Sequence, residues 1–356
     1  MSHSIPVIRT LAPKQKPADE SKLAFGQLFT DHMFMMDYVK GQGWINPRIV
    51  PYAPLQMDPS TMVFHYGQSV FEGLKAYRCA DDTINLFRPH MNFERMNLSD
   101  ERMAIPPLDE ELCVEAVKQL VRLEADWVPS APDTSLYIRP FVFAADPFLG
   151  VRPSNTYHFL VILSPSGPYY PQGLNPIDVY VEDEYVRAVK GGTGFTKCSG
   201  NYAASLLSQA NAYKSGFVQV LWLDGIHRKY IEEVGAMNVC FVIDGKLVTP
   251  MLNGSILPGI TRQSVLETAA DFGMEVEERL LSIDELGALY TEGRVSEMFG
   301  CGTAAVISPV GSLKYQDTVM TFNGGQIGPV SQRMYDTLTG IQYGRLPGPE
   351  GWIEKV

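Results

Sequence analysis

The feature that most constrains the fold is the mixture of tight hairpins and separate helices in the second half of the chain. Asp224-Gly225 and Asp244-Gly245 each lie between two strand-like runs, and Asp-Gly is a strong signal for a turn between antiparallel strands. Helices are expected over 201–214 and 261–272, and a capping box at 282–285 predicts the start of another. Because strands and helices do not alternate regularly, the pattern predicts an α+β fold rather than a doubly wound parallel sheet.

The first half of the chain is expected to hold strands and two helices. A helix is predicted near Pro89, since Pro suits a first turn, and an amphipathic helix over 108–127, capped by Asp109. Strands are expected at 69–78, 83–87, 135–144 and 158–163 in this half, and at 178–189 in the second.

A Pro- and Gly-rich stretch marks the best candidate for a domain boundary. Residues 164–173 collect several Pro and Gly residues directly after an apolar run, which is typical of a linker. The sequence therefore predicts two domains, a smaller α+β domain over 1–170 and a larger α+β domain over 171–356.

Composition narrows the class of protein. The 356 residues carry a net charge of −11, and no run of Lys and Arg occurs, which argues against a nucleic acid or an anionic membrane as partner. No apolar stretch approaches the ~18 residues of a membrane span, and residues 1–17 lack the apolar core of a secretion signal. The five cysteines are scattered and no His or Cys spacing suits a metal, so we expect a cytoplasmic protein without disulfides or metal.

The most unusual segment surrounds Lys197 with four glycines and leads into the helix expected from residue 201. A Walker phosphate loop requires Gly before the lysine and Ser or Thr after it, whereas this chain has Thr196 and Cys198 there. The remaining interpretations are a solvated surface lysine and a lysine whose neutral amine forms a Schiff base in a tight pocket.

Four other segments carry weaker signals, each with a plain structural alternative. Residues 300–305 match a dinucleotide pattern, but Pro309 prevents the long helix that such a site requires, which leaves a glycine turn for one phosphate or an ordinary turn. The other three are a helix start at 259–262, adjacent acids at 232–233, and Arg88 and Arg95 beside the helix near Pro89. Together with Lys197 they supply a Schiff-base lysine, phosphate sites and an acid, which is the set that pyridoxal phosphate requires.

In its ordered motifs the chain resembles the branched-chain amino-acid aminotransferases, a fold-type IV family of pyridoxal-phosphate enzymes related to the D-amino-acid aminotransferases. The resemblance runs over nearly the whole chain. The motifs that carry it are Phe29-Thr-Asp-His-Met33, Phe64-His-Tyr-Gly67, Phe71-Glu-Gly-Leu-Lys-Ala76, Leu86-Phe-Arg-Pro89, Glu94-Arg-Met96, Leu136-Tyr-Ile-Arg-Pro140, the Lys197 segment, Glu233-Val-Gly235 with Met237-Asn238, Ile256-Leu-Pro-Gly259 and Gly302-Thr-Ala304.

The resemblance implies a role for each cofactor-binding residue. Lys197 would form the Schiff base with pyridoxal 5'-phosphate and move the proton between the substrate and the cofactor. Tyr202 would hydrogen-bond the cofactor's phenolic oxygen, and Glu233 would keep its ring nitrogen protonated. Phosphate contacts are implied for Arg95, Arg187, Ile260, Thr261 and Thr303.

The same resemblance implies a substrate pocket for L-leucine, L-isoleucine or L-valine that also accepts glutamate and 2-oxoglutarate. Its apolar and aromatic lining would come from Phe25, Tyr66, Phe71, Tyr137 and Val151. Arg139, with the hydroxyls of Tyr66 or Tyr137, would receive the second carboxylate of glutamate, and the backbone at Thr303 and Ala304 the α-carboxylate.

The family generally completes its site with a loop of the partner subunit, so a homodimer is expected. A D-amino-acid aminotransferase and an aminodeoxychorismate lyase share the fold and remain alternatives, although Tyr137-Ile-Arg139 and the chain length favour the branched-chain enzyme. A catalytically inactive protein that only binds the cofactor is the alternative of a different class. The presence of Lys197 together with its orienting residues argues against it.

Overall fold

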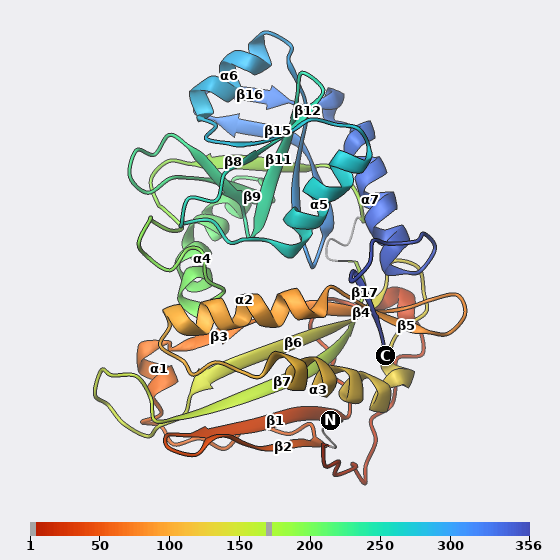
Figure 1. The fold of residues 1–356 in the computed structure, drawn as a ribbon. Helices are drawn as coiled ribbons and strands as arrows, with labels where there is room; N and C mark the ends of the chain where they lie inside the picture. The colour runs from red at the N-terminus through yellow and green to blue at the C-terminus, as the bar shows by residue number, and fades with distance from the viewer. Residues whose placement is uncertain (1–4, 169–172) are drawn as a thin grey trace. The chain divides into compact units, whose positions relative to one another are not determined.

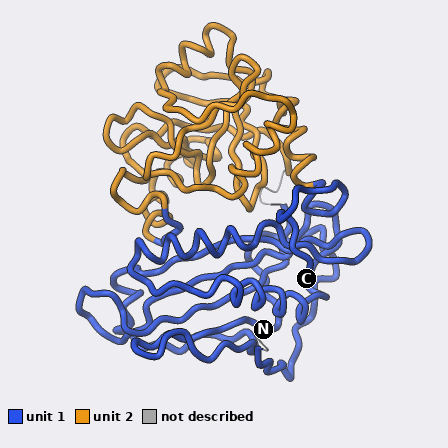
Figure 2. The backbone as a smooth tube through the Cα atoms, in the orientation of Figure 1, with its two compact units in different colours: residues 1–171, 196–199, 340–356 blue, residues 172–195, 200–339 orange. Residues whose placement is uncertain are grey.

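The computed structural model describes residues 5–168 and 173–356 and contains two compact units (Figure 2). Unit 1 comprises residues 1–171, 196–199 and 340–356, and unit 2 comprises 172–195 and 200–339. The sequence-based boundary at residue 170 lies beside this division, and part of the expected linker, 169–172, lies outside the described residues. Lys197 and the C-terminal segment group with unit 1, whereas the sequence analysis assigned both to the second domain.

Unit 1 is built on an eight-stranded sheet in which every pairing is antiparallel. The strand order is β17-β5-β4-β6-β7-β1-β2, and β3 pairs separately with β6. The strands are β1 His32–Val39, β2 Gly43–Pro51, β3 Ser69–Phe71, β4 Leu74–Arg78, β5 Ile84–Phe87, β6 Ser135–Ala144, β7 Thr156–Ser166 and β17 Ile353–Lys355.

Two long helices cover one face of this sheet (Figure 1), and a smaller cluster around Met33, Phe143 and Leu160 lies on the other face. The helices of unit 1 are α1 Met62–Tyr66, α2 Pro89–Arg102 and α3 Glu110–Leu123, with short 3-10 turns at Glu20–Lys22 and Ala125–Trp127. Along β6, Leu136 and Ile138 point into the core formed with α2 and α3. Since side chains alternate along a strand, Tyr137 and Arg139 point to the opposite face.

Unit 2 is built on nine strands, six of which form a closed ring. The order is β10-β9-β8-β15-β14-β11-β12-β13, and β10 also pairs with β11, so the first six strands close on themselves; β16 pairs with β15. The strands are β8 Ile177–Glu182, β9 Gln219–Leu223, β10 Ile231–Val234, β11 Met237–Ile243, β12 Lys246–Pro250, β13 Val276–Arg279, β14 Val295–Gly302, β15 Val306–Tyr315 and β16 Thr318–Thr321.

The remaining helices belong wholly or mostly to unit 2, and a capping side chain sets the start of one of them, α6. They are α4 Ser199–Lys214, α5 Ile260–Asp271, α6 Ile283–Thr291 and α7 Pro329–Gln342, with a 3-10 turn at Asn323–Gly325. Ser282 accepts the Glu285 N–H and so starts α6, as the capping box predicted, and Asp109 caps α3 in unit 1 in the same way.

The α+β fold is confirmed, and so are most of the expected elements. The Asp244-Gly245 hairpin forms with both residues at positive φ, 52° and 77°, as a two-residue turn requires. The first hairpin also forms, but over a longer loop in which the Asp224 carboxylate accepts the N–H groups of residues 226, 227, 229 and 230.

Two expected strands differ from the structure. The strand expected over 178–189 is wrong beyond Glu182, because the Glu182 carboxylate accepts the N–H groups of Glu184 and Tyr185 and turns the chain. The run 69–78 is divided into β3 and β4 by Glu72 and Gly73. The pairing of β17 with β5, which brings the C-terminal segment into unit 1, has no counterpart in the sequence analysis.

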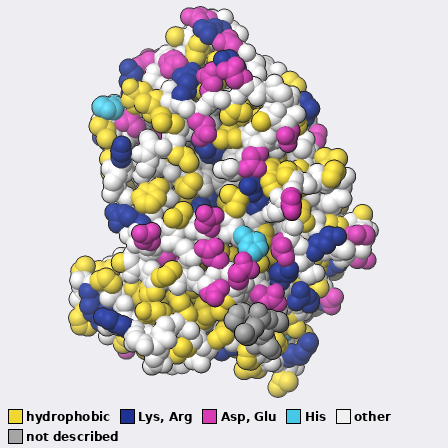
Figure 3. All heavy atoms as spheres, viewed as in Figure 1, with side chains coloured by type: hydrophobic (Ala, Val, Ile, Leu, Met, Phe, Trp, Pro, Cys, Tyr) yellow, Lys and Arg dark blue, Asp and Glu magenta, His cyan; other side chains and the backbone are white. Residues whose placement is uncertain are grey.

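The described part of the chain contains no helix that is long and apolar enough to cross a membrane. On the face shown in Figure 3, Lys and Arg side chains are interspersed with Asp and Glu rather than gathered into one basic patch. All five cysteines are free thiols, and four of them are buried.

Candidate active site

Lys197 is held in unit 1 by its backbone. Its carbonyl accepts the Phe71 N–H at 3.0 Å, its own N–H donates to Ser99 Oγ at 3.0 Å, and Cys198 forms a β-bridge with Val70. These contacts explain why residues 196–199 group with unit 1. The main chain of the candidate Schiff-base lysine is therefore fixed on both sides.

Around Lys197, unit 1 brings together four of the expected substrate residues. Lys197 Nζ lies 5.0 Å from the centre of the Phe71 ring, and the Arg139 guanidinium lies 4.8 Å from the same ring. Arg139 Nη2 donates to the Tyr137 hydroxyl at 3.0 Å, and Phe25 contacts the Tyr137 ring edge-on at 4.8 Å. The result is an aromatic surface with cationic groups at its border, suited to an aliphatic chain and a carboxylate.

Two details of this cluster bear on ligand binding. Arg139 Nε is buried and has no hydrogen-bond partner among the described residues, so a donor remains for an anion. Gly73 is required beside it, because a Cβ there would lie 2.1 Å from the Tyr137 hydroxyl oxygen. The close approach of Gly73 therefore sets the position of Tyr137.

Arg95, the expected phosphate residue, lies on α2 and is buried in an ion pair with Glu72. Arg95 Nε and Nη2 each donate to a Glu72 carboxylate oxygen at 2.8 Å. This two-point pairing fixes the plane of the guanidinium, which is the group that a phosphate contact would use.

Tyr66 and Val151, the other two expected pocket residues, are both associated with the loop 147–153. The Tyr66 hydroxyl donates to the Leu149 carbonyl, which joins α1 to the loop 147–153. Val151 in that loop is 85% exposed. The structure therefore joins Tyr66 to the exposed loop that carries Val151.

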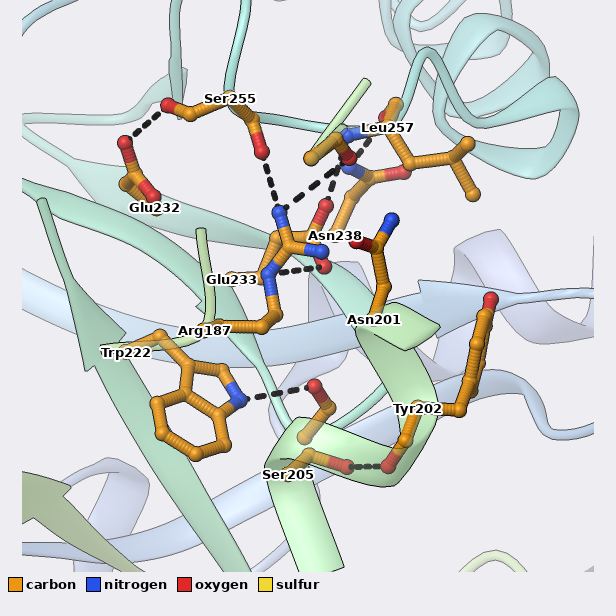
Figure 4. A network of polar contacts seen from close by, with 12 residues as sticks. Arg187, Asn201, Tyr202, Ser205, Trp222, Glu232, Glu233, Asn238, Ser255 and Leu257 are labelled. Carbon is orange, nitrogen blue, oxygen red and sulfur yellow. Dashed lines mark hydrogen bonds and ion pairs between the residues drawn. The ribbon is translucent and has the colours of Figure 1, made fainter. Parts of the chain in front are cut away.

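In unit 2, Glu233 and Arg187 form the centre of a buried polar network (Figure 4). Arg187 Nε lies 3.3 Å from Glu233 Oε2, and Glu233 Oε1 accepts the Leu257 N–H at 2.8 Å. Arg187 Nη2 donates to the Ser255 carbonyl, and Ser255 Oγ donates to Glu232. Arg187, expected to contact a phosphate, is thus the direct partner of Glu233 in this structure.

Ile260 and Thr261 begin α5, as the phosphate prediction requires. Gly259 occupies the N-cap position, and no side chain among the described residues caps the helix. A Cβ on Gly259 would lie 2.0 Å from Asn238 Oδ1, so the glycine admits the Asn238 side chain, whose Nδ2 donates to the Leu257 carbonyl. A buried, uncapped helix start of this kind presents N–H groups suited to an anion.

Thr303 and Ala304 lie in the three-residue connection between β14 and β15. The residue that closes the connection, Val306, has a φ of 62°, a conformation that is strained for a β-branched side chain. A strained backbone conformation persists only where the surrounding structure enforces it, and such residues cluster at active sites and ligand-binding loops. Tyr202 lies separately in the first turns of α4, where its carbonyl accepts Ser205 Oγ.

Each unit by itself holds groups of the kinds that a phosphorylated pyridine cofactor requires. Unit 2 contains the buried Glu233 carboxylate and the uncapped start of α5, and unit 1 contains the amine of Lys197 and the guanidinium of Arg95. Glu72 and Asn238 were not predicted as site residues, although both lie inside motifs that carry the family resemblance. The sequence could have indicated Glu72, because it is an acid within an apolar strand run. A carboxylate buried in such a run requires a partner.

Comparison with known proteins gives matches along the whole chain. The family described as Amino-transferase class IV matches residues 69–313. Branched-chain-amino-acid aminotransferase 2 of Bacillus subtilis (strain 168) is 55% identical over 353 residues, which are 99% of this chain and 97% of that protein.

Two solved structures are also similar. The branched-chain amino acid aminotransferase of Escherichia coli has a TM-score of 0.77 at 29% identity and covers 91% of this chain and 98% of its own. A second branched-chain amino acid aminotransferase, from the organism abbreviated T.th. and complexed with N-(5'-phosphopyridoxyl)-L-glutamate, has a TM-score of 0.73 at 28% identity and covers 90% and 97%.

Proposed function

The chain belongs to the class IV aminotransferases and, within them, to the branched-chain-amino-acid aminotransferases, and on this premise we propose the reaction it catalyses. It transfers the amino group of L-leucine, L-isoleucine or L-valine to 2-oxoglutarate, giving the branched 2-oxo acid and L-glutamate. The observation that carries this proposal is the 55% identity, over 99% of the chain, to a relative named for the same activity.

Pyridoxal 5'-phosphate is the cofactor, and its ring withdraws electrons from the substrate Cα when it is bound. The similar solved structure that holds a phosphopyridoxyl compound supports this assignment. Lys197 binds the cofactor carbonyl, and Arg95, Thr303 and the N–H groups of Ile260 and Thr261 bind its phosphate.

Glu233 and Tyr202 orient the ring. The Glu233 carboxylate, buried and held by Arg187 and the Leu257 N–H, pairs with the ring nitrogen and keeps its proton in place. Arg187 then acts on the cofactor mainly through Glu233, and Tyr202 donates to the phenolic oxygen. With cofactor and substrate bound, the Lys197 amine would be the base that accepts the proton of the substrate Cα.

The substrate side chain lies on the aromatic cluster of unit 1. Phe25, Phe71 and Tyr137 offer apolar surface to a branched aliphatic chain. When glutamate or 2-oxoglutarate binds, the unpaired Nε of Arg139 and the Tyr137 hydroxyl receive the second carboxylate, because a charge-assisted hydrogen bond offsets the cost of burying it. The Thr303-Ala304 backbone receives the α-carboxylate.

The active protein is a homodimer in which the loop carrying Val151 completes the pocket of the other subunit. Phe148, Leu149 and Val151 are all exposed in the single chain, and a contiguous apolar loop of this kind is typical of an interface. Tyr66 holds this loop through the Leu149 carbonyl, which gives Tyr66 a place at the same interface. The five free thiols favour a reducing compartment, so the enzyme is cytoplasmic.

A substrate panel tests the proposed activity. Purified enzyme with pyridoxal 5'-phosphate and 2-oxoglutarate is expected to form L-glutamate from L-leucine, L-isoleucine and L-valine, and none from D-alanine. Activity with D-alanine alone would instead assign the chain to the D-amino-acid relatives. Sedimentation of the same preparation at twice the mass of the 356-residue chain tests the dimer.

A further inference from the structure

Glu72 occupies the two-residue interruption between β3 and β4 and is completely buried. Its backbone N–H donates to the Pro140 carbonyl at 2.8 Å, which keeps the interruption against β6. A carboxylate with no exposure to water is costly unless it is paired, so its partners identify what it does.

Four donors satisfy the Glu72 carboxylate. Oε1 accepts Arg95 Nε, and Oε2 accepts Arg95 Nη2, each at 2.8 Å. Oε2 also accepts Asn92 Nδ2 at 2.8 Å and the Gly73 N–H at 3.2 Å. The two-point contact determines the plane of the Arg95 guanidinium as well as its position.

Four groups set the charge of this cluster: Glu72 itself, Arg95 and Asp100 on α2, and Lys197. Burial alone raises the pKa of the Glu72 carboxyl, but the attraction and hydrogen bonds of Arg95, together with the charge of Lys197, bring it below its ordinary value. Asp100 on α2 differs, because burial and the nearby charge of Glu72 raise its pKa well above the ordinary value. The two carboxyls therefore differ in direction: the pKa of Glu72 is held below its ordinary value, and the pKa of Asp100 is raised above it.

Neither oxygen of Asp100 has a hydrogen-bond partner among the described residues. Glu72 directly follows Phe71, whose N–H binds the Lys197 carbonyl and whose ring centre lies 5.0 Å from Lys197 Nζ, and the charges of Glu72 and Lys197 interact.

We propose that Glu72 is a positioning residue of the transamination reaction: it fixes Arg95 for the cofactor phosphate and provides the counter-charge for Lys197. The inference rests on the proposed function, because Arg95 and Lys197 act there on pyridoxal 5'-phosphate. Glu72 itself touches neither cofactor nor substrate in this account. It acts through Arg95 by orientation and through Lys197 by charge.

The test compares Glu72→Gln with Glu94→Gln in the full-length protein. Both variants remove one negative charge from the neighbourhood of Arg95, but Glu94 is exposed on α2, whereas Glu72 is buried against the guanidinium. Cofactor-free protein is titrated with pyridoxal 5'-phosphate by visible absorbance. Glu72→Gln is expected to weaken the Kd for pyridoxal 5'-phosphate about tenfold or more. Loss of a residue that orients a metal ligand has an effect of this size on metal affinity. Glu94→Gln is expected to weaken the Kd less than about twofold.

A spectroscopic readout separates positioning from a merely structural role. The pH midpoint at which the visible band of the Lys197-bound cofactor titrates is expected to fall by about one unit in Glu72→Gln, because a negative charge beside a cation is lost. Glu72→Asp retains the charge and is expected to keep the wild-type midpoint. A weaker Kd with an unchanged midpoint in Glu72→Gln would make Glu72 a packing residue and overturn the proposal.

Two further outcomes are distinguished. If circular dichroism shows that Glu72→Gln does not fold, Asn92→Ala decides, since it removes one hydrogen bond from Glu72 and leaves the ion pair. A severalfold weaker Kd supports the proposal, and a wild-type Kd overturns it. If the wild-type protein itself shows no visible band with pyridoxal 5'-phosphate, the proposed function is refuted. That outcome is distinct from a failure of the Glu72 proposal, which requires a wild-type band.

Discussion

Replacing Glu233 by Gln perturbs the buried network of unit 2 at its centre. The Arg187 and Glu233 side chains are only 7% and 4% exposed, and their nearest atoms lie 3.3 Å apart. Gln keeps an oxygen for the Leu257 N–H but turns an amide group toward Arg187, which leaves a buried cation without its counter-charge.

The expected loss of unfolding free energy depends on how many hydrogen-bond partners Arg187 keeps. Breaking a buried ion pair by removing one partner costs about 3–5 kcal/mol. Arg187 retains the carbonyls of Gly194 and Ser255, so we expect the lower end, about 3 kcal/mol. For a chain of this size that corresponds to a fall in Tm of roughly 4 °C in the cofactor-free protein. Loss of the charge beside the ring nitrogen is expected to reduce kcat about a hundredfold.

Two assays and a neighbouring variant check this reasoning. Thermal unfolding of the cofactor-free protein gives the Tm, and leucine-dependent glutamate formation gives kcat. Glu232→Gln is the control, because Glu232 is equally buried but its Oε2 has no hydrogen-bond partner among the described residues. Glu232→Gln is expected to keep kcat within about threefold. A Glu233→Gln enzyme with nearly wild-type kcat would refute the role of Glu233, whatever its Tm.

Three further predictions concern unit 1. Lys197→Ala is expected to abolish transamination while still binding pyridoxal 5'-phosphate without the visible band; turnover in this variant would exclude Lys197 as the reacting amine. Gly73→Ala places a Cβ where it would meet the Tyr137 hydroxyl, so we expect a loss of about 1–3 kcal/mol in unfolding free energy and a higher KM for 2-oxoglutarate, both measurable on one preparation. Burial lowers the pKa of Lys75 to about 8, so its charged form disfavours the folded state at neutral pH. The stability of the wild type should therefore rise between pH 8 and 10.5 relative to Lys75→Met, and at pH 7 the variant should be more stable by up to about 3 kcal/mol; equal pH profiles from denaturant unfolding would contradict the burial of this charge.

Local signals in the sequence predicted the elements that depend on local chemistry. β6 has the predicted bounds, 135–144, because an alternating apolar run defines both its ends and its buried face. The caps Asp109 and Ser282 start their helices where the sequence placed them. Asp244-Gly245 likewise fixes its turn, since both residues tolerate positive φ.

The same local signals could not predict which distant segments of the chain pair with one another. Lys197 joins unit 1 because its backbone bonds to Phe71 and Ser99, which lie about a hundred positions earlier in the chain. The pairing of β17 with β5 is equally remote in sequence. A period-2 or period-3.6 pattern reports which face of an element is buried, but not which distant segment covers it.

In the candidate site too, the sequence predicted individual residues but not the contacts between distant ones. Motif resemblance named Lys197, Glu233 and Arg95, but it gave no indication that Arg187 contacts Glu233 directly or that Arg95 is paired with Glu72. Buried polar contacts of this kind depend on three-dimensional proximity of single atoms, which spacing along the chain does not encode.

The most direct test of the account is the absorbance spectrum of the purified protein with pyridoxal 5'-phosphate, recorded before and after L-leucine and then after 2-oxoglutarate. We expect a visible band that disappears with L-leucine and returns with 2-oxoglutarate, since each addition completes one half of the amino transfer. A visible band that does not respond to L-leucine, or no band at all, would contradict it.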